Sequence, residues 1–123
     1  MKNKTALISI AFVASTLMST SSFAESKVCV TLPFGVGYAA SFDVETVDGH
    51  FKTQNTDRFN VGETKCIDVS PLESGTQYKV TIHPFWGTSR DCDPVITKED
   101  GDSHITFKAT GTTLNPHCSM YGM

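Results

Sequence analysis

The sequence lacks the short motifs that mark many enzymes, and it carries no excess of positive charge. No G-x-S-x-G or H-E-x-x-H segment occurs in its 123 residues, which removes the local signatures of an α/β-hydrolase nucleophile and of a zinc protease. Ten lysines and arginines stand against thirteen aspartates and glutamates, so nucleic acids and anionic membrane surfaces are poor partners on electrostatic grounds. We therefore predict no catalytic residue, no cofactor and no nucleic-acid partner.

Long apolar runs are missing after residue 24, so no later segment reaches the roughly 20 apolar residues that a membrane-spanning helix needs. Residues 1–24 have the order of a secretory signal peptide: lysines near the start, an apolar run over 6–18, and the small residues Ser22 and Ala24 at the end. We expect cleavage before Glu25 and no stable membrane insertion of the remaining chain.

The mature chain, residues 25–123, has the length of a single domain with one modest core. Loss of Lys2 and Lys4 leaves eight basic side chains against thirteen acidic ones, a net charge of −5. A chain of this sign attracts cationic partners without identifying them. The export signal predicts a periplasmic or secreted location.

Closely spaced cysteine pairs are also absent. The four cysteines are Cys29, Cys66, Cys92 and Cys118, and the nearest two are 26 residues apart. Structural zinc sites usually take ligands from close pairs such as C-x-x-C, whereas an even count behind an export signal favours disulfides. Of the three possible connectivities we favour Cys29 with Cys66 and Cys92 with Cys118. Each bond should stabilise the fold by roughly 3 to 4 kcal/mol on the chain-entropy model.

No window carries a long apolar stripe at helical spacing, whereas period-two alternation recurs along the mature chain. The alternating apolar positions are Val28, Val30 and Leu32; Phe42 and Val44; Ile67 and Val69; Tyr78, Val80 and Ile82; and Ile105, Phe107 and Ala109. Residues 85–102 form a long excursion with a short strand at Val95 and Ile96, and residues 112–123 form a tail. The pattern predicts an all-β fold, a small antiparallel immunoglobulin-like sandwich stapled by two disulfides, with a small β-barrel as the alternative.

Asp48-Gly49 supplies a two-residue hairpin turn within this pattern. The register across the turn sets Thr46 against Phe51 and Glu45 against Lys52. A β-branched side chain then meets a ring and a negative charge meets a positive one, which stabilises neighbouring antiparallel strands.

The segment from Leu72 to Ile82 resembles the corner before the sixth strand of fibronectin type III domains and related sandwiches. Leu72 is followed by a turn with Thr76, and Tyr78 comes two residues later at the start of the best alternating strand. The resemblance implies a buried Tyr78 ring whose hydroxyl bonds to backbone groups at the corner. The tryptophan expected earlier in immunoglobulin domains is missing, because the only tryptophan is Trp86.

The same segment is similar to the SGxxY signature of bacterial periplasmic lysozyme inhibitors, through Ser74, Gly75 and Tyr78 with Phe85-Trp86 further on. In that family the loop serine enters the lysozyme cleft. The resemblance therefore implies that Ser74 bonds to the enzyme's catalytic carboxyl groups, with Gly75 allowing close approach and Tyr78 supporting the loop. The Lys-Gly that follows the family's tryptophan is replaced here by Gly87-Thr88.

Two groups of residues have the chemistry of metal ligands. Glu99, Asp100 and Asp102 place three carboxylates within four residues, a fragment of a calcium loop that a turn at Asp100-Gly101 explains more simply. In the tail, His117, Met120 and Met123 offer the imidazole and thioether ligands that copper accepts. Isolated surface histidines and a methionine-containing tail are the commoner explanation of this second set, and we assign no metal.

Several aromatic residues fall outside the strand pattern: Phe34 and Tyr38 in the glycine loop, Phe85 and Trp86 after Pro84, and Tyr121 in the tail. Protein interfaces concentrate their energy in Trp, Tyr and Arg, and Arg90 lies in the same loop. The alternative is that Trp86 closes one end of the core. The sequence is thus typical of an exported, non-enzymatic binding module whose 85–92 loop meets a protein or glycan partner. A hydrolase inhibitor using Ser74 and a copper-binding protein are the second and third interpretations.

Overall fold

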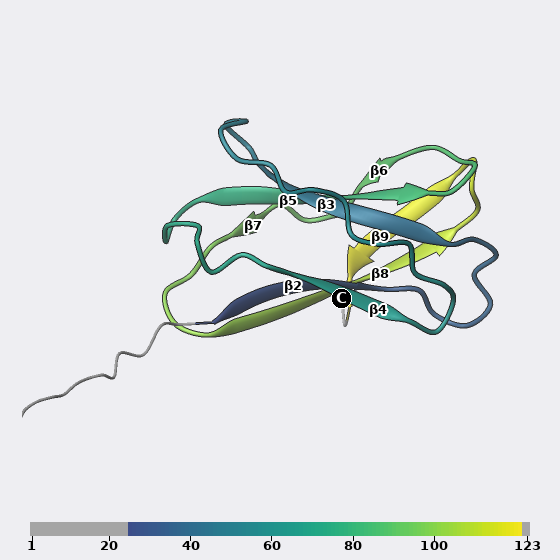
Figure 1. Ribbon diagram of the computed structural model, residues 1–123, viewed down its shortest axis with the longest axis horizontal. Coiled ribbons are helices and arrows are strands. Elements are labelled where there is room, and N and C mark those ends of the chain that lie inside the picture. The colour runs from purple at the N-terminus through teal and green to yellow at the C-terminus, as the bar shows by residue number, and fades with distance from the viewer. Residues whose placement is uncertain (1–24, 122–123) are drawn as a thin grey trace, which may run out of the picture.

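The computed structural model describes residues 25–121, which form an all-β fold of two packed sheets (Figure 1). The strands are β2 (Ser26–Thr31), β3 (Ala40–Thr46), β4 (Thr64–Asp68), β5 (Gln77–Pro84), β6 (Arg90–Asp91), β7 (Ile96–Thr97), β8 (Ser103–Gly111) and β9 (Pro116–Met120). One sheet has the order β4-β2-β8-β9, and the other has the order β3-β5-β6 with β7 also paired to β5. The all-β, sandwich-like architecture is confirmed, while the signal peptide expected over 1–24 lies outside the described residues.

Side-chain alternation builds the core as the sequence predicts. The fully buried side chains on the inner faces include Val28 and Val30 on β2, Phe42 and Val44 on β3, Val80 and Ile82 on β5, and Phe107 on β8. Phe59 joins them from the loop before β4 and meets Phe42 edge to face, with 6.3 Å between ring centroids. Because each large apolar side chain contributes about 1.5 to 3 kcal/mol when buried, this interface holds the two sheets together.

The first sheet contains one parallel pair in an otherwise antiparallel fold. β2 runs parallel to β8, with Val28 beside Ile105 and Val30 beside Phe107, and antiparallel to β4. Single-strand alternation shows which face a residue occupies but not the direction of its neighbour. The sequence predicts an antiparallel sandwich, and the structure differs from it in this one strand pair.

Both expected disulfides are present. Cys29 and Cys66 lie directly opposite each other on β2 and β4. Cys92 and Cys118 join the β6 side of one sheet to β9 of the other. Asp93 adds backbone bonds at the same edge, since its amide donates to the Cys118 carbonyl at 3.1 Å and its carbonyl accepts from the Met120 amide at 3.0 Å. The Cys92–Cys118 disulfide and the two hydrogen bonds of Asp93 together connect the sheets along one side of the sandwich.

The C-terminal tail expected over 112–123 instead contains strand β9, paired antiparallel with β8. A tight connection makes this possible: Thr112 and Asn115 exchange backbone hydrogen bonds of 3.2 Å. In the sequence Pro-His-Cys-Ser-Met the first, third and last residues lie on the inner face, where Pro116 and Cys118 are buried and Met120 packs against the core. The excursion over 85–102 does contain a short strand, β7, which begins at Ile96 rather than Val95.

The hairpin register is right, but its turn is wider than a two-residue turn. Glu45 pairs with Lys52, and the Thr46 amide donates to the Phe51 carbonyl at 2.9 Å. The Gly49 amide donates to the Thr46 carbonyl, also at 2.9 Å, so the turn is centred on residues 47 and 48 and Gly49 follows with φ +80°. The Val47 amide donates to the Gln77 carbonyl on β5, so Val47 does not take part in the pairing across the turn that a two-residue turn requires.

No helix within residues 25–121 is long and apolar enough to cross a membrane.

Candidate functional site

Three loops meet at one end of the sandwich, on the right of Figure 1. We call this the Trp86 end and define it as residues 32–39, 85–89 and 112–115. The Phe85 amide donates to the Ala39 carbonyl at 2.9 Å, and the Thr88 amide donates to the Thr113 carbonyl at 2.8 Å. The 85–89 loop is therefore hydrogen-bonded to both of its neighbours, and the three loops form one surface.

Large apolar side chains of all three loops are exposed at this end. Relative exposure is 94% for Trp86, 87% for Phe34 and 79% for Leu114. Phe85 is more covered, and the guanidinium of Arg58 lies 5.0 Å from the centre of its ring, in a cation–π contact. Trp86 thus does not close the core, and that interpretation of the sequence is wrong.

The backbone of the 85–89 loop is fixed in an unusual conformation. Trp86 has φ +66°, a region that residues with a Cβ seldom adopt, and the Gly87 amide donates to the Pro84 carbonyl at 3.3 Å. A Cβ at Gly87 would lie 2.3 Å from the Thr113 carbonyl oxygen. Glycine is required there because the neighbouring loop approaches so closely.

A chain of three polar side chains anchors the far side of this loop, and no local sequence pattern pointed to it. His83 on β5 contacts the buried Asp43 carboxylate on β3 through Nε2 at 2.7 Å, and Ser89 Oγ through Nδ1 at 2.7 Å. The available signal is strand phase: Asp43 and His83 both occupy outward positions, which become neighbours only once β3 is paired with β5.

The order of these side chains matches that of a nucleophile, a base and an orienting acid. Acyl transfer also needs amides that stabilise an oxyanion. The Gly87 and Thr88 amides donate to the Pro84 and Thr113 carbonyls. The contacts that the structure shows for Asp43, His83 and Ser89 are those that connect the loop to β5 and β3.

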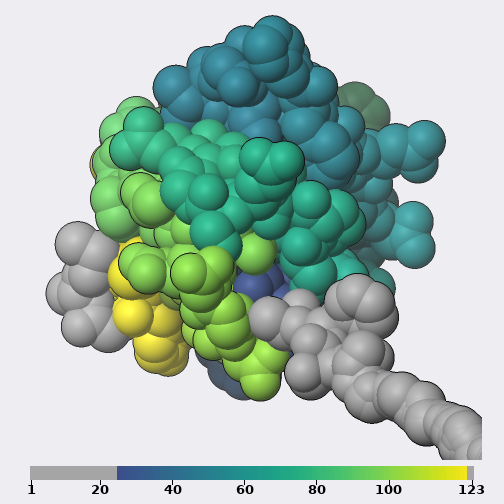
Figure 2. Space-filling model, turned by 90° about the vertical axis from the view of Figure 1, so that its left-hand side faces the viewer, coloured from purple at the N-terminus to yellow at the C-terminus, as the bar shows by residue number. Residues whose placement is uncertain are grey.

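The sequence-predicted partner residues fall into two separate groups. Phe85, Trp86 and Arg90 lie at or next to the Trp86 end, where Arg90 begins β6 and is exposed. Ser74 precedes β5 and so lies at the opposite end of that strand. Figure 2 faces this second end, where the 47–51 turn, the loop before β5 and the loop before β8 lie side by side.

Ser74 is exposed, and its hydroxyl donates to the Asp100 carboxylate. Gly75 has φ +89°, and its amide donates to the Lys98 carbonyl at 2.8 Å. Tyr78 is buried, and burial raises the pKa of its hydroxyl to about 12. Within residues 25–121, the tyrosine hydroxyl that bonds to backbone is that of Tyr38, which donates to the Thr110 carbonyl at 2.6 Å.

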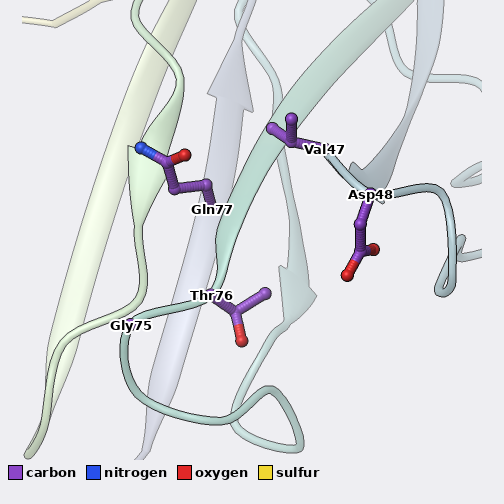
Figure 3. A pocket seen from close by; sticks show the side chains of 5 residues that line it. All are labelled: Val47, Asp48, Gly75, Thr76 and Gln77. Carbon is purple, nitrogen blue, oxygen red and sulfur yellow. The ribbon is translucent and has the colours of Figure 1, made fainter.

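A shallow hollow of about 300 Å³ lies beside this loop, lined by Val47, Asp48, Gly75, Thr76 and Gln77 (Figure 3). Asp48 is its charged group. The His50 amide and the Thr46 hydroxyl both donate to the Asp48 carboxylate, and they hold its pKa below the usual value. The carboxylate therefore already serves as an acceptor within its own turn.

Within residues 25–121, the candidate metal ligands of the sequence are not brought together. His117 and Met120 pair with Thr110 and Phe107 respectively, so they lie on opposite faces of β9, and Met120 packs against the core. Met123 lies outside the described residues. In the acidic group, Asp100 accepts from Ser74 and Asp102 accepts from the Glu25 amide at 2.7 Å. These contacts give both carboxylates structural roles. Of the tail set, the two described residues, His117 and Met120, do not meet.

Comparison with known proteins assigns no family. No family model matches the sequence, and no curated protein matches it. A solved structure described as a Gram-negative toxin is 15% identical over 81% of this chain and 23% of its own, with a TM-score of 0.45. Listeriolysin O is likewise 15% identical, over 80% of this chain and 22% of its own, with a TM-score of 0.44. The chain thus spans less than a quarter of either protein, and similarity of this size identifies no function.

Proposed function

We propose that this chain is a non-enzymatic binding module of the periplasm or the cell exterior, which engages a protein partner through the Trp86 end. The observation that carries the proposal is Trp86, which is 94% exposed and has φ +66°. The exposure of this apolar side chain and the strain of its backbone both lower the stability of the folded chain when no partner is bound. Strained residues cluster at ligand-binding sites, where binding compensates for their cost.

The rigidity of the 85–89 loop supports this function. The loop is tied to neighbouring loops by the Phe85 and Thr88 amides, to β5 through His83 and Ser89, and to β9 through the disulfide of Cys92. A side chain that is already positioned loses little conformational entropy on binding. Trp86 is therefore suited to act as an anchor that enters a pocket on the partner.

The chemistry of the surface favours a protein over a glycan. Phe34, Trp86 and Leu114 are exposed and wholly or largely apolar, and Arg58 lies beside them on Phe85. Protein interfaces are enriched in aromatic residues and arginine at their centre. Sugar hydroxyls instead require closely spaced hydrogen-bonding groups, which these three side chains do not offer beyond the indole N–H.

The two disulfides support a location outside the cytoplasm. Bonds of this kind persist in oxidising compartments, and small exported domains use them to supplement a limited core. Partners are accordingly to be sought among envelope and extracellular proteins.

The test is affinity capture with the mature protein, residues 25–123, followed by a binding measurement on each captured protein. Trp86→Ala should weaken binding at least tenfold, as expected for a residue at the centre of an interface. Tyr121→Ala is the matched control, because Tyr121 is 60% exposed and does not belong to the three loops. A glycan array and neutral lipid vesicles serve as further probes with the same variants.

Loss of binding in Trp86→Ala and Leu114→Ser, with Tyr121→Ala unchanged, supports a protein interface at this end. Equal binding by all three variants rules out the Trp86 end. Binding to the array or to vesicles that depends on Trp86, without a protein that does, replaces the protein partner by a glycan or a lipid surface.

A lysozyme inhibitor that uses the Ser74 loop is the second candidate. Ser74 and Gly75 form an exposed turn above the buried Tyr78, which is the arrangement that the SGxxY resemblance implies. The bond from Ser74 to Asp100 would have to be exchanged for one to the enzyme. This candidate uses the end opposite to Trp86, so the two functions are experimentally separable.

The test measures whether the protein inhibits the lysis of bacterial cell walls that lysozyme catalyses. Ser74→Ala should abolish inhibition, while Trp86→Ala should leave it intact. If the unaltered protein shows no inhibition at micromolar concentration, this candidate is discarded and the first is unaffected.

A further inference from the structure

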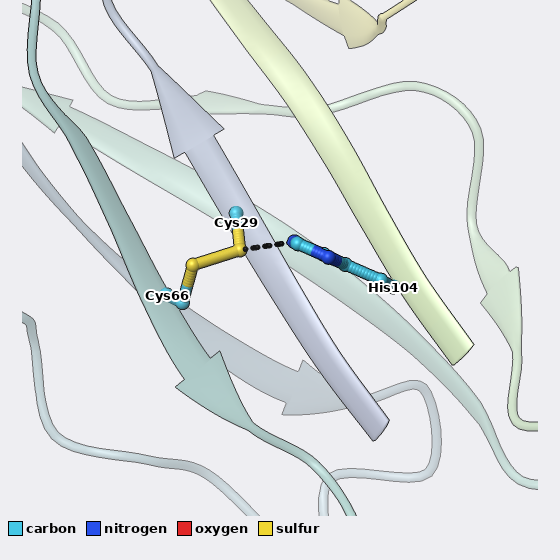
Figure 4. A group of neighbouring side chains, drawn as sticks. All are labelled: Cys29, Cys66 and His104. Atoms are coloured by element: carbon cyan, nitrogen blue, oxygen red, sulfur yellow. Dashed lines mark hydrogen bonds between the residues drawn. A yellow bond between two sulfur atoms is a disulfide. The ribbon is translucent and has the colours of Figure 1, made fainter. Parts of the chain in front are cut away.

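The outer face of the first sheet carries a second assembly of reactive side chains, which shares no residue with the three loops of the Trp86 end. Cys29 on β2 and Cys66 on β4 form the disulfide, and His104 on β8 lies beside it (Figure 4). His104 Nε2 is 3.1 Å from Cys29 Sγ. The group lines an open hollow of about 410 Å³, together with Thr31, Thr64, Thr106 and Tyr121.

The two disulfides differ in their access to solvent. Cys92 and Cys118 are both buried, with relative exposures of 2% and 5%. Cys66 is exposed on the outer face, whereas Cys29 is fully covered. A thiolate that attacks a disulfide must reach a sulfur atom from outside. Access therefore selects the Cys29–Cys66 bond, and within it the Sγ of Cys66.

We propose that a dithiol selectively reduces the Cys29–Cys66 bond and that the reduced pair, together with His104, binds a thiophilic cation such as Zn²⁺. In the first step a thiolate of the dithiol bonds to Cys66 Sγ, the Cys29–Cys66 bond breaks, and Cys29 leaves as a thiolate that accepts a hydrogen bond from His104 Nε2–H. The second thiol of the dithiol then attacks the mixed disulfide and releases Cys66. The protein disulfide gains two electrons, and the dithiol is oxidised to its own disulfide.

The ligand atoms are already positioned for a metal. The two Sγ atoms and a ring nitrogen of His104 all lie within 4.8 Å of one another. Zinc bonds of about 2.3 Å to sulfur and about 2.0 Å to nitrogen in a tetrahedron set ligand atoms about 3.5 to 3.8 Å apart. Once the sulfur–sulfur bond opens, small side-chain rotations bring all three to that spacing. Two thiolates and one imidazole leave the fourth position open toward the hollow.

The sheet around the site does not depend on the disulfide for its register. β2 pairs with β4 over five residue pairs and with β8 over six. These backbone bonds keep Cys29, Cys66 and His104 on adjacent strands after reduction. Zn²⁺ displaces the thiol protons when it binds, so the site exists only in the reduced form and is switched by redox state.

The first experiment treats the mature protein with increasing dithiothreitol, alkylates free thiols and locates them by mass spectrometry. Cys29 and Cys66 should be alkylated at least ten times faster than Cys92 and Cys118, which act as the internal control. Reduction of both bonds at the same rate overturns the proposal.

The second experiment titrates Zn²⁺ alone, without oxygen, into the selectively reduced protein against a chromophoric chelator. One equivalent should bind to the reduced form and none to the oxidised form. His104→Ala and His104→Gln should each weaken binding by at least about 100-fold, because each removes a ligand, whereas loss of a group that only supports a ligand costs about 10- to 100-fold. His117→Ala should leave binding unchanged. Co²⁺ should give thiolate charge-transfer absorption that Cys66→Ser weakens, because it removes one of the two thiolates.

Absence of zinc binding, binding that is insensitive to both His104 variants, or a circular dichroism spectrum of an unfolded chain after selective reduction would each overturn the site. None of these outcomes bears on partner binding by the Trp86 end, because the two surfaces share no residue.

Discussion

The backbone conformation of Trp86 lowers the stability of the folded protein. At φ +66° a residue with a Cβ is strained by about 1 kcal/mol, whereas glycine is not. The side chain is 94% exposed, so its removal loses little packing. We predict that Trp86→Gly raises the free energy of unfolding by about 1 kcal/mol relative to Trp86→Ala, as measured by urea denaturation.

The comparison between the two variants isolates the backbone, because both lack the ring. Equal stability would show that the loop relaxes to negative φ when the tryptophan is replaced. Both variants should lose partner binding, since both remove the anchor.

Two buried tyrosines make the fold sensitive to alkali. Burial raises the pKa of Tyr38 and of Tyr78 from 10 to about 12. The folded state therefore holds these protons more tightly than the unfolded state does. Their contribution is fully present below pH 10 and is lost as the pH rises from 10 to 12. Urea midpoints should fall over that window, and the absorbance change at 295 nm should show two tyrosines ionising near its upper end.

Of the two buried tyrosine hydroxyls, that of Tyr38 has a backbone partner. Tyr38→Phe tests what this hydroxyl contributes to stability. The variant keeps the ring but removes the 2.6 Å bond to the Thr110 carbonyl, which joins the loop before β3 to β8. The free energy of unfolding should fall by about 0.5 to 1.5 kcal/mol at pH 7, and the loss of stability between pH 10 and 12 should shrink. An unchanged alkaline loss would assign that loss to Tyr78 alone.

At the scale of single elements, Glu45 on β3 lies between two lysines. It pairs with Lys52 across the hairpin and with Lys79 on β5. Glu45→Lys replaces two attractive pairs by two repulsive ones, each worth about 0.2 to 1 kcal/mol. Unfolding free energy should therefore drop at low salt and recover in part at high salt, where exposed charges are screened. Glu45→Gln, which removes the charge without adding repulsion, should cost less and depend less on salt.

Elements with a long two-faced pattern could be predicted from sequence, whereas a short one that begins with proline was missed. Tyr78, Val80 and Ile82 identify β5 because each is buried on one face while the residues between them are not. In β9 the inward residues are Pro116, Cys118 and Met120. Proline is disfavoured within strands, and the pairing of β9 with β8 depends on the Thr112–Asn115 connection. The Glu45–Lys52 register followed from side-chain phase, but the turn width depended on the Gln77 carbonyl, which belongs to a distant strand.

At the scale of the whole molecule, the site was only half visible in the sequence. Trp86 stood out because it fits no strand, but its exposure depends on where its loop ends relative to the core. Phe34 stood out for the same reason, but Leu114 did not, and the three side chains formed one group only once the sandwich set their loops at the same end. His104 reached the Cys29–Cys66 bond through the parallel pairing of β2 with β8, a contact between residues 75 positions apart that no local pattern encodes.

The two disulfides also divide their effects between the two surfaces of the molecule. Cys92 and Cys118 link the sheets beside β6, directly after the 85–89 loop, and the Cys92 amide donates to the Val80 carbonyl at 2.7 Å. Cys29 and Cys66 join neighbouring strands of one sheet. With sequence separations of 26 and 37 residues, each bond should stabilise the fold by about 3.5 to 4 kcal/mol on the chain-entropy model.

Replacing each pair with alanines should therefore lower stability by similar amounts but loosen different regions. In Cys92→Ala/Cys118→Ala the Thr88 and Cys92-position amides should exchange with deuterium much faster than in the unaltered protein, and binding through Trp86 should weaken because the anchor is no longer held. In Cys29→Ala/Cys66→Ala those amides should keep most of their protection, since β6 and the loop retain their link to β9. Equal loss of protection in the two variants would mean that the molecule opens as one cooperative unit, in which case the rigidity of the Trp86 end comes from the whole sandwich rather than from the bond beside it.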